Sequence, residues 1–138
     1  MSCNPLLSVG RGDYPLAGRI ILVVEDQMML LRMMEGMLRD LGCTEISAAE
    51  TVPEGIAMTN AVDFDAVALD VNLNGTMSFP VADALAAKGV PFMFVTGYGE
   101  SGIPVDYKDR PVLRKPFLFD QAIAAFALLL PSRLEVKH

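Results

Sequence analysis

The sequence predicts an α/β domain, a doubly wound parallel sheet of five strands with helices on both faces. Apolar, strand-like runs alternate with helical segments at about 20–25 residues per unit, which is the spacing of right-handed βαβ crossovers. The first run, residues 19–24 (RIILVV), is apolar throughout and rich in β-branched residues, which is typical of a strand buried on both faces. The segments between the runs have a helical period and end at glycine or proline.

Each element follows from local composition and spacing. The five predicted strands are residues 19–24, 45–49, 65–69, 91–96 and 111–114, of which the second is the weakest. The four predicted helices are residues 27–41, 51–61, 79–88 and 119–130.

Residues with strong positional preferences mark the helix ends. Gly42 and Gly89 are good helix terminators, and Pro131 ends the last helix. Thr51 is expected to be an N-cap, with Pro53 in the first turn of its helix. These signals agree with the periodicity, so the helix assignments rest on two kinds of observation.

One segment interrupts the alternation. Residues 97–110 (GYGESGIPVDYKDR) contain three glycines and one proline where the pattern calls for a fourth helix. Because both residue types oppose helix formation, we expect a short or irregular helix here.

The length of 138 residues indicates a single domain. We assign residues 19–131 to it, residues 1–18 to a flexible N-terminal tail, and residues 132–138 to a C-terminal tail. A chain of this size buries about two-thirds of its unfolded surface, so it needs no disulfide or metal to fold. Because the domain takes up nearly all of the 138 residues, we expect no second domain fused to it.

Composition excludes several functions. The net charge of −6 argues against nucleic-acid binding, which needs clustered Lys and Arg. Cys3 and Cys43 have no metal-ligand spacing, and the single histidine, His138, is the last residue, so histidine-based catalysis is excluded in practice. The longest apolar stretch, residues 122–130, is too short for a bilayer, which takes about 20 residues. With no targeting signal either, we expect a soluble cytoplasmic protein.

Chemically useful side chains follow several predicted strands. In open parallel sheets, ligands bind at the carboxyl ends of the strands. Glu25 and Asp26 end the first strand, Asp70 the third, Thr96 the fourth and Lys115 the fifth. An acidic pair after a strand is as often a solvated loop or cap, but the joint pattern favours a site.

Three carboxylates held close together repel one another unless a divalent cation lies between them. Oxygen ligands without His or Cys favour Mg²⁺. Lys115 and Thr96 would suit phosphoryl oxygens, and a carboxylate can itself be the nucleophile that forms an acyl phosphate. Asp70, central in the sheet, is the candidate nucleophile.

With these residues in these positions, the sequence resembles the receiver domains of two-component response regulators. The matching motifs, in register over about residues 19–130, are LVVED (22–26), ALDVNLNG (68–75), VTG (95–97) and RKPF (114–117). The resemblance implies a flavodoxin-like sheet of order 2-1-3-4-5. It also implies that a sensor histidine kinase or histidine phosphotransferase phosphorylates Asp70, and that the protein is not a turnover enzyme.

The resemblance implies a role for each site residue. Asp26, Asp70 and the backbone carbonyl of Asn72 would ligate Mg²⁺, with Glu25 assisting through water. Thr96 and Lys115 would bind the phosphoryl oxygens, and the bond from Lys115 to Pro116 is expected to be cis.

The chain departs from the family at its switch. The usual switch aromatic, three residues before the lysine, is replaced by Val112. The segment PFMFVTGYG (91–99) resembles a subgroup of stand-alone receivers called FAT GUY, which usually has Ala where Val95 stands. Our hypothesis is that Tyr98, or mobility of residues 97–110, replaces the missing ring.

Two further functions remain open. The first is a phosphorylation-independent adaptor that keeps the receiver fold, against which the complete set of site residues argues. The second is a phosphatase with an aspartyl-phosphate intermediate. Such an enzyme would need a cap over its substrate, and the chain has no insertion large enough to form one.

A receiver would pass its signal to a downstream protein target by contact, without nucleic acid or membrane.

Two apolar surfaces have more than one interpretation. Methionines crowd the first helix, and we interpret them as core and helix surface rather than as a partner groove. The last helix is apolar nearly all round, and Ala124, Ala127 and Leu128 are candidates for a homodimer or partner face.

Overall fold

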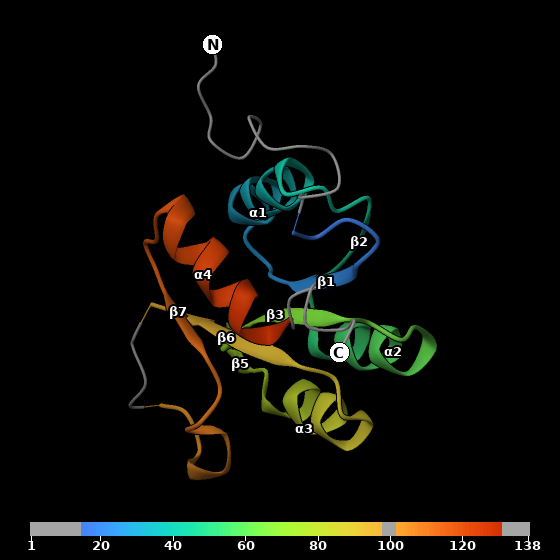
Figure 1. The fold of residues 1–138 in the computed structure, drawn as a ribbon. Helices are drawn as coiled ribbons and strands as arrows, with labels where there is room; N and C mark the ends of the chain where they lie inside the picture. The colour runs from blue at the N-terminus through green and yellow to red at the C-terminus, as the bar shows by residue number, and fades with distance from the viewer. Residues whose placement is uncertain (1–14, 98–101, 131–138) are drawn as a thin grey trace.

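A five-stranded parallel sheet of order β2-β1-β3-β6-β7 forms the centre of the protein (Figure 1). The computed structural model describes residues 15–97 and 102–130. The strands of the sheet are β1 (Ile20–Val24), β2 (Glu45–Ala49), β3 (Ala66–Asp70), β6 (Phe92–Thr96) and β7 (Val112–Arg114). The helices are α1 (Met28–Asp40), α2 (Val52–Ala61), α3 (Phe79–Lys88) and α4 (Phe119–Leu129). The predicted fold class and strand order are confirmed.

The helices cover both faces of the sheet, α1 and α4 one face and α2 and α3 the other (Figure 1). Alternate residues of β1 enter the two cores. Ile21 and Val23 pack under α1 and α4, whereas Leu22 and Val24 pack under α2 and α3. This arrangement explains why the strand is apolar at every position, since neither of its faces meets water.

The helix ends use the residues that the sequence singles out. The Thr51 side chain caps α2 by accepting a hydrogen bond from the Glu54 backbone N–H at 3.2 Å. Gly89 ends α3 in the left-handed region at φ 73°, which costs glycine little.

From residue 102 on, the connection from β6 to β7 has the irregular form expected of it. In this described part, the helical structure is a 3-10 turn, η3 (Val105–Tyr107). Ile103 is buried beside the core under α3 and anchors this part of the chain to the domain.

A small antiparallel hairpin follows β3 and is absent from the sequence prediction. Its strands are β4 (Asn72–Leu73) and β5 (Thr76–Met77). Asn74 and Gly75, at φ 54° and 92°, make the turn between them, and the Gly75 N–H donates to the Asn72 side chain at 2.7 Å. The hairpin therefore shapes the chain directly after Asp70.

The packed domain includes part of the segment expected to be an N-terminal tail. Residues 15–18 form a turn, in which Leu16 is 3% exposed. The Leu16 backbone N–H donates to the Leu41 carbonyl at 3.0 Å, next to the end of α1. The rest of the expected tail, and the C-terminal segment 132–138, lie outside the described residues.

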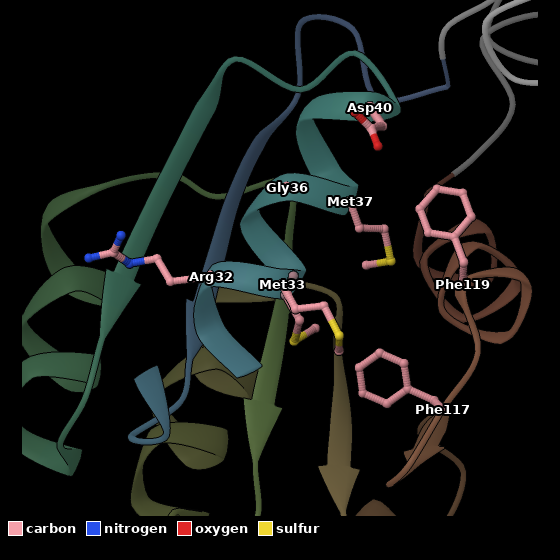
Figure 2. Close-up of a pocket in the computed structure, with 8 residues that line it drawn as sticks. Arg32, Met33, Gly36, Met37, Asp40, Phe117 and Phe119 are labelled. Atoms are coloured by element: carbon pink, nitrogen blue, oxygen red, sulfur yellow. The ribbon is translucent and has the colours of Figure 1, made fainter. Parts of the chain in front are cut away.

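The apolar surfaces of α1 and α4 divide between core and exterior. Met34 and Met37 of α1 are buried, but Met29 is 87% exposed. Met33 and Met37 lie across from Phe117 and Phe119, and these four residues line a groove of about 390 Å³ (Figure 2).

Ala124, Ala127 and Leu128 all lie on the outward side of α4, and Leu128 is 74% exposed. Within the described ranges, every helix is too short or too polar to cross a membrane.

Candidate functional site

The site lies at the carboxyl edge of the sheet, where four strands deliver one polar group each. Asp70 and Thr96 are the last residues of β3 and β6, Glu25 follows β1 directly, and Lys115 follows β7. Backbone ladders fix these ends, because the Lys115 N–H donates to the Thr96 carbonyl at 2.8 Å and the Glu25 N–H donates to that of Ala49 at 2.9 Å. The strands that the sequence predicts thus converge as expected.

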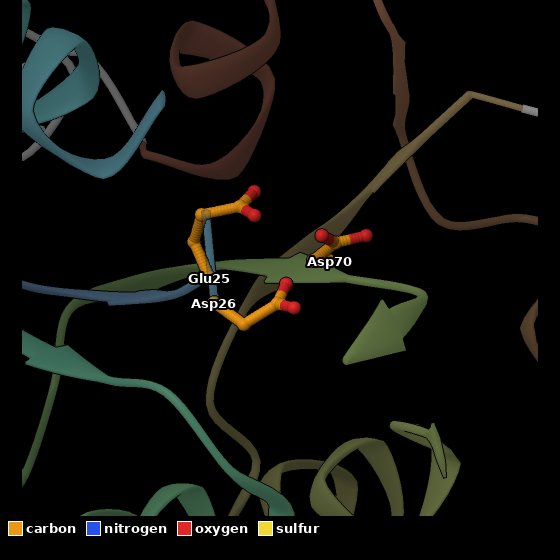
Figure 3. Close-up of side chains that lie close together, drawn as sticks. All are labelled: Glu25, Asp26 and Asp70. Carbon is orange, nitrogen blue, oxygen red and sulfur yellow. The ribbon is translucent and has the colours of Figure 1, made fainter. Parts of the chain in front are cut away.

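The three predicted carboxylates form one cluster (Figure 3). One oxygen atom each of Glu25, Asp26 and Asp70 lies within 4.8 Å of the other two. Glu25 and Asp70 are buried, at 1% and 4% exposure, and Asp26 is partly exposed. The cluster therefore has a buried floor and an open side at Asp26.

Lys115 joins this cluster through two ion pairs. Its Nζ atom lies 3.0 Å from Asp70 Oδ2, to which it donates a hydrogen bond, and 3.5 Å from Glu25 Oε1. Burial acts to lower the pKa of Lys115, but the hydrogen bond and charge of Asp70, together with Glu25, outweigh it and raise that pKa. The side chain stays an ammonium group.

Glu25 lies in an environment that disfavours its charged form. Burial, with the nearby Asp70 charge, raises its pKa to about 7, although the Gln27 backbone N–H donates to its Oε2 at 3.0 Å. One ammonium group does not compensate three carboxylates at such separations, so the cluster has an excess of negative charge.

Asp70 is held at both oxygens. Its Oδ1 accepts a hydrogen bond from the Asn72 backbone N–H at 3.2 Å, and its Oδ2 accepts from Lys115. The carboxylate is consequently fixed in orientation by the hairpin on one side and by β7 on the other. Thr96 lies beside it on β6 and is buried, at 2% exposure.

The remaining predicted residues lie close by or outside the described chain. The Lys115–Pro116 peptide bond is cis. Val112 is the first residue of β7 and packs partly buried against the core under α3. Tyr98 lies outside the described residues.

The donor set fits a hard divalent cation. All candidate ligand atoms are oxygens, and two of the three carboxylates are buried. Such a set suits Mg²⁺, which binds few carboxylates and keeps positions for water and phosphate oxygens.

Sequence reasoning missed the surroundings of the cluster. A polar groove of about 450 Å³ opens beside Asp26, between the start of α2 and the β4–β5 hairpin. Its lining includes Thr51, Asn74 and Thr76. The Asn74–Gly75 dipeptide is a strong hairpin signal and could have predicted this wall of the groove.

Fold and site together define a flavodoxin-like domain with an acidic cluster and a paired lysine at the carboxyl edge of its sheet. Residues 21–126 match the sequence profile of the response regulator receiver domain. The chain belongs to that family, which confirms the resemblance seen in its motifs.

Named relatives agree with this membership. The solution structure of SdrG from Sphingomonas melonis is 41% identical, with a TM-score of 0.72, and the match covers 80% of this chain and 95% of SdrG. A second SdrG structure, 40% identical with the same TM-score of 0.72, is described as the BeF3-activated conformation and covers 83% and 98% of the two chains.

Two more distant proteins complete the comparison. The transcriptional regulatory protein TcrA of Mycobacterium tuberculosis is 31% identical over 141 residues, 94% of this chain but 54% of TcrA. The chain thus spans about half the length of the curated relatives it matches. TrrA of Thermotoga maritima, a response regulator solved with Mg²⁺ and BeF, shares the fold at 24% identity and a TM-score of 0.72, over 81% and 99% of the two chains.

Proposed function

We propose that this protein is a response regulator that accepts a phosphoryl group on Asp70, with Mg²⁺, and signals by contact with another protein. The donor is the phosphohistidine of a sensor histidine kinase or histidine phosphotransferase, in the cytoplasm. The observation that carries the proposal is the hydrogen bond of Lys115 Nζ to Asp70 Oδ2, at 3.0 Å, beside two further carboxylates.

The proposed reaction is a transfer between two nucleophiles. A carboxylate oxygen of Asp70 attacks the phosphorus, the P–N bond breaks, and its electron pair goes to the imidazole nitrogen of the donor. The product is an acyl phosphate on Asp70. Water later cleaves it to inorganic phosphate and restores the carboxylate, so the protein turns over its own modification and no small substrate.

The positions of the residues support a role for each. Lys115 already contacts Asp70, and its ammonium would neutralise a phosphoryl oxygen placed there. Thr96 would donate a hydrogen bond to another oxygen, because it ends the neighbouring strand β6. The N–H of Asn72 holds the acceptor carboxylate in place.

Mg²⁺, when bound, supplies positive charge against the phosphoryl oxygens. Asp26, Asp70 and the Asn72 carbonyl would hold it, with Glu25 acting through water. The close approach of the three carboxylate groups supports this assignment, as does the raised pKa of Glu25, since both mark an uncompensated negative charge.

The switch is proposed to differ from that of receivers with an aromatic ring three residues before the lysine. Val112 occupies that position and has no ring to turn inward. The signal would therefore pass from Thr96 into residues 97–110, to which Tyr98 also belongs.

Incubation with Mg²⁺ and a small phosphodonor such as acetyl phosphate tests the proposal. We expect a base-labile adduct of one phosphoryl group, detected by intact mass and absent from Asp70→Asn. Asp109→Asn, an exposed carboxylate of the β6–β7 connection, is the matched control and should be labelled like the wild type. An unlabelled wild type would support the phosphorylation-independent adaptor instead, and a labelled Asp70→Asn would contradict the assignment of Asp70 as the acceptor.

A further inference from the structure

In the described part of the β6–β7 connection, Tyr107 attaches the chain to the domain between two other contacts, the buried side chain of Ile103 and the Arg110 guanidinium, which lies 4.3 Å from the centroid of the Phe92 ring. Residues 103–110, called here the η3 segment, lie beside α3 (Figure 1). The segment has short-range backbone bonds of its own, from the N–H groups of Tyr107, Lys108 and Arg110 to carbonyls three residues earlier. These bonds shape the turn but do not hold it against the sheet.

The ring of Tyr107 packs on the strand that leads to the site. Its centroid lies 5.7 Å from that of Phe92 and 6.0 Å from that of Phe94, both in β6. Phe94 in turn meets Phe79, the first residue of α3, edge-on at 6.0 Å. Since Phe94 stands two residues before Thr96, the Tyr107 ring contacts β6 close to its end at the candidate phosphoryl site.

The hydroxyl of Tyr107 makes the second attachment. It donates a hydrogen bond to Asp83 Oδ1 in α3, which raises the pKa of Tyr107 to about 12. A hydrogen bond to a carboxylate is stronger than one to a neutral group. Because Asp83 is exposed, however, water can replace this partner, so the attachment can be broken at a modest cost.

We propose that Tyr107 is a positioning residue, a releasable latch that holds the η3 segment on β6 and α3 and couples its position to the site at Thr96. The latch rests on the proposed function, because it gives a signal at the carboxyl edge a defined route out of the site. It occupies the place in the mechanism that an aromatic ring at position 112 would otherwise have. The ring transmits the position of β6, and the hydroxyl sets how firmly the segment is held.

Amide hydrogen exchange tests the latch without any phosphoryl chemistry. The N–H groups of Tyr107, Lys108 and Arg110 are the reporters. We expect Tyr107→Phe, which keeps the ring, and Asp83→Ala to speed their exchange by about fivefold or more. Asp83→Asn, which keeps an acceptor oxygen, should have a smaller effect, and the double variant of Tyr107→Phe with Asp83→Ala should exchange no faster than either single variant.

Two internal controls separate the latch from general destabilisation. The exposed Asp109→Ala variant should leave the exchange rates of the three reporter amides unchanged. The Phe94 amide, which donates to the Pro111 carbonyl within the sheet, should exchange at the wild-type rate in every variant. Unchanged exchange at the three reporters in Tyr107→Phe, or additive effects in the double variant, would overturn the latch.

Binding of beryllofluoride with Mg²⁺ tests the coupling. The affinity of Tyr107→Phe should differ from that of the wild type by about threefold or more, whereas Asp109→Ala should match the wild type. Equal affinities of Tyr107→Phe and wild type would overturn the coupling. A wild type that binds no beryllofluoride would contradict the proposed function and with it the coupling, while the exchange result would still decide the latch by itself.

Discussion

The Nζ atom of Lys115 lies 3.0 Å from Oδ2 of Asp70. Asp70 ends β3 and Lys115 follows β7, and these two strands flank β6 on opposite sides. The pair is formed by residues 45 positions apart in sequence, and it depends on the sheet order for its existence. An ammonium group at this distance neutralises part of the charge on the acceptor carboxylate. It also stands where charge on a phosphoryl group would develop.

Lys115→Met should therefore weaken beryllofluoride binding by about tenfold or more, the value of a hydrogen bond to a charged group. Binding of Mg²⁺ alone should be unchanged or tighter, because the variant removes a positive charge from the site. Isothermal titration calorimetry measures both affinities.

Lys88→Met is the matched control, because the Nζ of Lys88 serves the fold and not the site. It donates to the carbonyls of Thr59 and Val62, at 2.7 and 3.2 Å, near the end of α2. We expect this variant to lose about 1–2 kcal/mol of unfolding free energy and to bind beryllofluoride as the wild type does. Wild-type beryllofluoride affinity in Lys115→Met would contradict the assigned role.

The affinity for Mg²⁺ should depend on pH through Glu25. Its pKa of about 7 means that, in the metal-free protein, the Glu25 carboxyl is mostly protonated below that pH. A proton and Mg²⁺ therefore compete for the same carboxylate. Lowering the pH from 8 to 6 should weaken Mg²⁺ binding by about tenfold, with proton release on binding.

Glu25→Gln tests the assignment of this pH dependence. The variant should bind Mg²⁺ more weakly than the wild type at pH 8 and vary little between pH 6 and 8. An equally steep dependence in the variant would assign the titration to another group. Calorimetry in two buffers of different ionisation enthalpy gives the number of protons released.

The same carboxyl should also affect the stability of the metal-free protein. A pKa raised from 4.5 to about 7 means that the folded state binds a proton more tightly than the unfolded state. The unfolding free energy therefore falls as the pH rises from about 4.5 to 7. In EDTA, Glu25→Gln should be more stable than the wild type at pH 8, by about 1–3 kcal/mol, and about equally stable near pH 4.5. Urea unfolding at both pH values measures this; an advantage that is constant with pH would contradict the prediction.

Local signals account for most of the fold and for the identity of the site residues. The predicted bounds of β2 and α3 are those of the structure, and the end of α3 is marked by Gly89. β3 begins one residue later than predicted because Asp65 leaves the strand pattern and its side chain accepts the Ile20 N–H at 2.7 Å.

Features that depend on distant packing were beyond sequence reasoning. The pKa of Glu25 is raised by burial, and nothing next to Glu25 in the sequence shows what covers it. Likewise, Tyr107 had no assigned role, because its contact with Asp83 joins residues 24 positions apart that share no local pattern. The convergence of the carboxyl ends of parallel strands predicted which side chains meet, but not how strongly their environment shifts their pKa values.

Two helical glycines make a matched pair for stability. At Gly36, in the exposed side of α1, an added Cβ would meet no atom within 4 Å. At Gly55, in α2, it would meet Cγ2 and Cγ1 of Val81 at 3.0 and 3.3 Å. Val81 is fully buried and its branched side chain is stiff, so it cannot easily move away.

Gly36→Ala should therefore stabilise the protein by about 0.5–1 kcal/mol, the difference in helix propensity between the two residues. Gly55→Ala gains the same propensity but overpacks the contact between α2 and α3, with a net loss of about 1–2 kcal/mol. Thermal unfolding of both variants gives the sign directly. Stabilisation by Gly55→Ala would mean that α2 and α3 separate easily. Because the β4–β5 hairpin connects Asp70 to the start of α3, such freedom would also loosen the wall of the site.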